Sequence, residues 1–192
     1  MASTAAPFGA RPVNTMSASG SFTGKVQHIK IASGYATAIF NGDFVKLVYA
    51  GTVEKDTGTS SLTTIGIFMG CKYTDPSSGQ LTFNQQYPAS TAASDIMAYV
   101  LTDPDVVFLM QGDGTIAQTA LGANFDVIQT AGSTSIGNSK NAVDADSVAT
   151  TNTFPLKIYD FYDGPESSIG DSFTDALFIF NVGHQYRNTT GV

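Results

Sequence analysis

The sequence predicts an all-β protein, a compact β-sandwich or small β-barrel with an extended N-terminal arm and at most one short helix. Short runs rich in Val, Ile, Phe and Tyr recur at intervals of about 8–12 residues, a spacing typical of strands in sandwiches and barrels. Gly, Pro and Asp separate these runs, and no amphipathic pattern is long enough for a helix that covers a sheet. No repeat of about 20–50 residues is visible, which disfavours propellers and solenoids.

Residues 1–24 differ in composition from the rest of the chain, because they are rich in Ala, Ser, Thr, Gly and Pro and show neither a strand nor a helix period. We predict that residues 1–24 form an extended arm and that residues 25–192 form a single β domain. The arm is open to two interpretations. It is either a disordered tail or a segment that becomes ordered against another subunit through its isolated apolar residues Phe8, Pro12, Val13 and Phe22.

Strand patterns dominate after the arm. In residues 26–32, Ile29 and Ile31 alternate with His28 and Lys30, so one face is expected to be apolar and the other polar. A continuous apolar run, as in residues 106–110, is typical of a strand buried on both faces. The other strand patterns in this half of the chain, each bounded by turn residues, are 43–50, 64–73, 81–83 and 96–101.

The pattern at 64–73 is interrupted by glycines. Ile65, Ile67, Met69 and Cys71 are expected to share one face, and glycines occupy intervening positions. Glycine inside a strand indicates the close approach of another backbone or a β-bulge.

In the second half of the chain, residues 115–128 are the only stretch with helical character, a turn or two ended by Gly122. A polar, loop-rich insertion with short edge strands is expected at 130–153, and strands at 154–162 and 173–183, the second of them buried, complete the fold. The expected core includes Val45, Leu47, Ile65, Ile67, Val107, Phe108, Leu156, Ile158, Phe178 and Phe180.

Composition excludes several classes of function. The net charge is −7 and the nine basic residues are scattered, which argues against nucleic-acid binding. Cys71 is the only cysteine, so an intramolecular disulfide is excluded. The N-terminus lacks the pattern of a signal peptide and no apolar run is long enough to span a bilayer, so we expect synthesis in the cytoplasm and no membrane association.

The sequence contains no motif of a catalytic site, and we expect neither an enzyme nor a cofactor. His28 and His184 lie far apart without metal-ligand spacing. Cys71 falls in an apolar pattern, which favours a small core residue over a nucleophile. A calcium site near Asp144 and Asp146 stays open as an alternative, although the spacing does not fit a calcium-binding loop.

Two blocks of turns and strands carry a resemblance to a known group of proteins. They are "GYATAIFNGDFVKLVYAGTV" at 34–53 and "IGIFMGCKYTDPSSGQLTF" at 65–83. Together they resemble the capsid decoration, or cement, proteins of tailed bacteriophages. The segments 98–111 and 153–171 are similar to marine-phage virion structural proteins. The similarity to the smaller decoration proteins of lambdoid phages is limited to 42–53 and 66–74, and the long C-terminal half departs from them.

The resemblance implies a virion structural protein that binds the outside of the phage capsid and cements neighbouring capsomers, which would stabilise the DNA-filled head. The implied partners are the major capsid protein and further copies of the chain in a homotrimer, with no nucleic acid and no membrane. The alternatives are a tail, baseplate or receptor-binding component, or a degenerate hydrolase. The arm residues expected to bind the capsid or a sister subunit are Pro7, Phe8, Arg11, Pro12, Val13 and Phe22.

Overall fold

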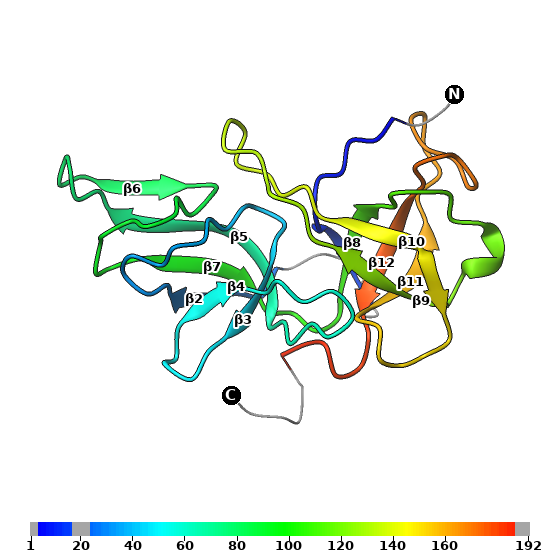
Figure 1. The fold of residues 1–192 in the computed structure, drawn as a ribbon, viewed down its shortest axis with the longest axis horizontal. Coiled ribbons are helices and arrows are strands. Elements are labelled where there is room, and N and C mark those ends of the chain that lie inside the picture. Colours follow the sequence, from blue (N-terminus) through cyan, green and yellow to red (C-terminus); the bar gives the residue numbers. More distant parts are fainter. Residues whose placement is uncertain (1–3, 17–23, 187–192) are drawn as a thin grey trace.

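The protein is all-β, as the sequence predicts. The computed structural model describes residues 4–16 and 24–186, and these fold into two antiparallel six-stranded sheets (Figure 1). The two sheets are consistent with a β-sandwich and do not close into a barrel. In the part of the chain that the structure describes, helical geometry is confined to a 3-10 turn, η1, at Gln118–Ala120.

Sheet A contains the C-terminal half of the chain and one strand from the N-terminus. The continuous apolar run is confirmed as a strand buried on both faces, since all six residues of β8 are buried. The last strand, expected to be buried throughout, instead alternates between buried and half-buried residues. The order across the sheet is β1 (Arg11–Thr15), β8 (Val106–Gln111), β12 (Asp175–Phe180), β11 (Leu156–Phe161), β9 (Asn124–Ile128) and β10 (Ala142–Ala149).

Sheet B is built from one continuous part of the chain between the two segments that form sheet A. It includes β4, a short strand for which the sequence pattern gives no separate prediction. A further strand, β6, pairs with the C-terminal part of β5. The order is β2 (Val26–Lys30), β7 (Met97–Leu101), β5 (Gly66–Thr74), β3 (Phe44–Leu47) and β4 (Val53–Lys55), with β6 (Leu81–Asn84) beside β5.

Part of the predicted N-terminal arm belongs to sheet A. Residues 11–15 form β1, which pairs antiparallel with β8 from Arg11 opposite Leu109 to Thr15 opposite Val106. This segment is therefore paired with its own chain. The pairing joins residues more than ninety positions apart, which explains why a local pattern did not reveal it.

The short helical turn expected before Gly122 is present as η1, whereas the residues after Gly122, for which no strand was predicted, form a strand. Only η1 is helical, and Asn124–Ile128 form β9. Phe125 and Val127 alternate into the core, which is the period of a strand. The polar segment that follows forms a longer edge strand than expected, because β10 extends over eight residues.

A β-bulge in β5 changes which side chains share a face. The pairing of β5 with β7 shifts its register between Phe68 and Gly70. As a result Phe68 and Cys71 lie in one apolar cluster and Ile67 in another. The expectation that Cys71 shares a face with Ile67 and Met69 is therefore wrong, because an inserted residue reverses the alternation.

The close backbone approach expected at the strand glycines is confirmed. A Cβ on Gly66 would overlap the carbonyl oxygen of Leu101 on the paired strand. A Cβ on Gly70 would lie 2.9 Å from the carbonyl oxygen of Asn84. These two positions thus accept no side chain unless the backbone shifts.

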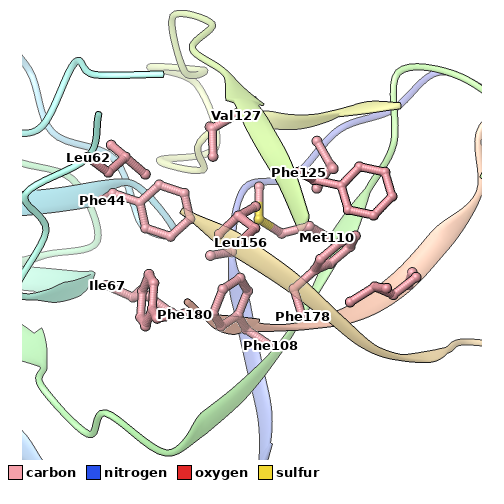
Figure 2. Packing of buried hydrophobic residues seen from close by; sticks show 14 of the residues in the cluster. Phe44, Leu62, Ile67, Phe108, Met110, Phe125, Val127, Leu156, Phe178 and Phe180 are labelled. Carbon is pink, nitrogen blue, oxygen red and sulfur yellow. The ribbon is translucent and has the colours of Figure 1, made fainter. Parts of the chain in front are cut away.

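Two apolar clusters form the interior. The central core combines sheet A with the end of sheet B that faces it, and Figure 2 shows Phe44 and Ile67 of sheet B beside side chains of sheet A. The second cluster, the sheet B core, lies on the opposite face of sheet B. Of the expected core residues, all are buried except Leu47, which is half-buried against the sheet B core.

A buried polar connection links the two sheets. Asp43, fully buried before β3, accepts hydrogen bonds from the Ser139 hydroxyl at 2.6 Å and from the Phe40 N–H at 2.9 Å. The Lys55 Nζ lies 3.0 Å from the same carboxylate. Because Ser139 precedes β10 of sheet A and Lys55 ends β4 of sheet B, one carboxylate joins both sheets. We call Asp43, Lys55 and Ser139 the polar clasp.

Candidate interaction surfaces

The histidines and aspartates that could act as metal ligands do not lie together. The ring of His28 packs edge-on against Tyr99, with centroids 4.6 Å apart, and the His184 Nδ1 lies 2.6 Å from the carbonyl oxygen of Leu62. Within residues 4–16 and 24–186, no group of three or more His, Cys, Asp or Glu side chains is placed to hold a metal ion. Asp144 belongs to no such group, and its carboxylate accepts a hydrogen bond from the backbone N–H of residue 146.

Cys71 is a core residue, as the sequence predicts. Its side chain is fully buried in the sheet B core, and its thiol lies 3.4 Å from the carbonyl oxygen of Gln86. Burial raises the pKa of Cys71 from the ordinary value to about 12. The thiolate form is therefore strongly disfavoured at neutral pH, and with it nucleophilic reactivity.

The arm is held along sheet A at several points. The Ala6 N–H donates to the Gln111 side chain at 2.7 Å, the Gly9 N–H to the Asn141 carbonyl and the Ala10 N–H to the Gly42 carbonyl. The first contact is to the last residue of β8, the second to the residue that precedes β10, and the third to the turn before β3. Beyond these bonds, β1 is the outermost strand of sheet A, so one of its edges has no partner strand among the described residues.

The predicted binding residues of the arm differ in their contacts and in their exposure. Phe8 is half-buried and the guanidinium carbon of Arg11 lies 4.6 Å from the centre of its ring, a cation–π contact. Val13 is 43% exposed on β1, and Pro7 and Pro12 are half-buried. Phe22 lies outside the described residues.

The arm forms one wall of an open pocket of about 930 Å³. Phe8, Arg11 and Val13 line it, and they are three of the residues that the sequence pattern singled out. The opposite wall comes from residues far away in the sequence, which no local pattern could connect to the arm. Those lining residues include Gln111, Tyr162, Pro165, Glu166 and Asp175.

Asp175 gives the pocket its main electrostatic feature. Burial raises the pKa of Asp175, and the nearby Glu166 acts in the same direction. A hydrogen bond from Gln111 and the charge of Arg11 lower that pKa in part. One carboxylate oxygen of Asp175 is buried without a hydrogen-bond partner among the described residues, so a donor from a partner could satisfy it.

The second surface is a face of sheet B. Lys30 pairs with Met97, Met97 with Lys72, and Lys72 with Phe83, so these four side chains form a row across β2, β7, β5 and β6. Phe83 is 66% exposed and Lys30 is also exposed. We call this surface the outer face of sheet B. It also includes the pair His28 and Tyr99. Leu81, two residues before Phe83 on β6, lies on the same side of the sheet.

The outer face lies opposite the sheet B core. Ala98 and Cys71, which alternate with Met97 and Lys72, are fully buried in that core. Sequence analysis identified the polar face of the first strand through His28 and Lys30 but did not connect it with its neighbours. That connection needs the register of four strands, which the pattern of one strand does not contain.

No protein-family model matches this chain, and neither a curated protein nor a solved structure matches it. The helical part of the described chain is too short to cross a membrane.

Proposed function

We propose that this chain is a virion structural protein that binds the outside of a phage capsid and cements neighbouring capsomers. The observation that carries the proposal is the outer edge of sheet A at β1. There, β1 has no partner strand on its outer edge among the described residues, and it lies beside a pocket lined by Phe8, Arg11 and Val13. Such an edge suits a partner that adds backbone hydrogen bonds and inserts side chains into an adjacent pocket.

The charge distribution supports an external position on the head. The net charge of −7 disfavours contact with packaged DNA, which would repel it. A protein that cements a shell needs only modest affinity at each contact, because many copies act together. The proposed partners are therefore the major capsid protein and further copies of this chain, assembled as a homotrimer.

Electron microscopy of the virion tests the proposal most directly. Hundreds of copies on the head surface are expected, together with a lower temperature of DNA release in virions that lack the protein. A few copies at the tail tip, or stable heads that fail to adsorb to cells, would instead assign a tail, baseplate or receptor-binding role.

Point variants test the edge of sheet A itself. The double variant Phe8→Ala, Arg11→Ala is expected to decorate empty heads with at least tenfold lower affinity while its far-UV CD spectrum stays that of a β protein. Tyr49→Ala is a suitable control, because this side chain is 95% exposed and lies in the turn after β3. Unchanged occupancy by the double variant would overturn the role of this edge.

A further inference from the structure

The outer face of sheet B concentrates positive charge in an acidic chain. Lys30 and Lys72 stand in one row with His28 nearby, and the acidic Asp95 lies close to Lys72. Asp95 accepts hydrogen bonds from the N–H and hydroxyl of Thr74, so its carboxylate is already engaged. The face thus combines two lysines with the exposed apolar side chains of Leu81 and Phe83.

A second surface also combines charged side chains with exposed apolar side chains, but its charges are negative. Between Lys157 and Arg187 the sequence contains neither Lys nor Arg. Within this stretch, the acidic segment comprises residues 159–171, which are the last three residues of β11 and most of the loop that leads to β12. Its charged side chains are Asp160, Asp163, Glu166 and Asp171, and its exposed apolar side chains are Tyr159, Tyr162 and Ile169.

The two surfaces lie at opposite ends of the molecule. Figure 1 shows β6 and the outer part of β5 at one end of the long axis, and the acidic segment, in orange, near the other. One molecule therefore cannot bring its own two surfaces together. A second copy can, since opposite charges and exposed apolar groups then face each other.

We propose that the acidic segment of one copy docks on the outer face of sheet B of the next copy. The contact joins two different surfaces, so it is heterologous, and it repeats until a ring closes. In a ring of three copies, each outer face of sheet B would contact the acidic segment of a neighbouring copy. This inference rests on the self-association included in the proposed function, but it requires nothing of the capsid.

Charge reversal tests each surface separately. Lys30→Glu, Lys72→Glu reverses the outer face, and Asp160→Lys, Asp163→Lys reverses the acidic segment at two residues that do not line the pocket beside β1. Each double variant is expected to weaken self-association of the purified full-length chain at least tenfold, measured by sedimentation equilibrium at low salt. Added salt should weaken the wild-type assembly in the same direction, because it screens exposed charges.

Recombining the reversals identifies the pairing. The chain that carries all four substitutions again presents complementary surfaces, and its assembly is expected to recover to within a few-fold of wild type. In an equimolar mixture of the two double variants, each matches only the other. That mixture should form assemblies with even numbers of copies and no trimer.

Control variants reverse one charge of each sign elsewhere on the molecule. Lys140→Glu and Asp146→Lys alter exposed residues outside both surfaces and should leave association unchanged. The inference is overturned if the wild-type chain stays monomeric at about 1 mM, a concentration that detects even a contact of a few kcal/mol. It is also overturned if either double variant assembles as wild type, or if the fourfold variant does not recover.

Binding to heads separates this inference from the proposed function. A wild-type chain that decorates heads but never self-associates would overturn only the head-to-tail contact. A chain that assembles as described but binds no head would overturn only the capsid role.

Discussion

The two cores are built from different kinds of side chain. In the central core, phenylalanines from both sheets are in contact, with ring centroids between 4.9 Å (Phe108 to Phe180) and 6.0 Å (Phe44 to Phe108). The sheet B core contains mainly Ile, Val and Ala, with tyrosines whose polar ends need partners. The hydroxyl of Tyr87, for example, donates to the carbonyl oxygen of Tyr35 at 2.9 Å.

The sheets also differ in how the chain reaches them. Sheet B uses residues 26–101 without interruption, whereas sheet A joins residues 11–15 to residues 106–180. Sheet B can therefore assemble from nearer contacts, while sheet A requires closure of a long loop before β1 meets β8. The central core and the polar clasp are the features that make the two sheets one unit.

The largest expected effect comes from opening the polar clasp. Asp43→Ala leaves the Lys55 ammonium buried without its carboxylate, which should lower the free energy of unfolding by about 3–5 kcal/mol. Chemical denaturation measures this loss, and hydrogen exchange reports whether β3 and β10 lose protection together.

A matched variant isolates the unpaired charge. Asp43→Ala combined with Lys55→Met removes both charges, so it should recover a large part of the lost stability. If the combined variant is no more stable than Asp43→Ala alone, the buried ammonium is not the cause of the loss.

The next effect concerns the contact between β5 and β7 in sheet B. Gly66→Ala places a methyl group against the carbonyl oxygen of Leu101, and the strand shift that follows should cost about 1–3 kcal/mol. Thermal unfolding followed by CD measures the change. Gly114→Ala is the control, because its added Cβ would meet only the Ala145 Cβ at 3.3 Å.

A smaller, pH-dependent effect is expected at Asp175 in sheet A. Its pKa is raised in the folded protein, so the folded state holds the proton more tightly than the unfolded chain. Stability is therefore lost as pH rises from the ordinary carboxyl pKa through the raised one. Asp175→Asn escapes this loss and should be more stable than wild type at neutral pH.

The pH profile decides the cause. Denaturant midpoints of the two proteins should converge as pH falls below the ordinary Asp pKa, where the wild-type carboxyl is protonated in both states. A difference of constant size from acid to neutral pH would show that ionisation of Asp175 is not responsible.

The last prediction concerns the low reactivity of the Cys71 thiol in the sheet B core, which involves no change in stability. Because burial raises the pKa of Cys71 to about 12, folded protein should react with iodoacetamide far more slowly than unfolded protein at pH 8. Mass spectrometry of the native protein over time measures the rate. Rapid modification without loss of CD signal would mean that the sheet B core opens independently of the central core.

The sequence by itself determined the fold class, most strands and most of the core. Alternating or continuous apolar runs bounded by Gly, Pro and Asp are local signals, so Phe108, Ile158 and Phe178 could be assigned from their neighbours alone. The sequence also singled out Phe8, Arg11 and Val13 in the arm. It gave no strand for residues 124–128, because a five-residue pattern directly after a helical turn is too short to be assigned from its period alone.

Only the tertiary structure decided which distant segments meet. The pairing of β1 with β8, the pocket wall formed by Glu166 and Asp175, and the row from Lys30 to Phe83 all depend on strand register. The alternation of side chains along a strand repeats every two residues and does not identify the strand that pairs with it. In addition, the bulge in β5 reverses the faces that alternation predicts for the residues after it. Register is fixed by packing of the complete core, so these surfaces exist only after the sheets have formed.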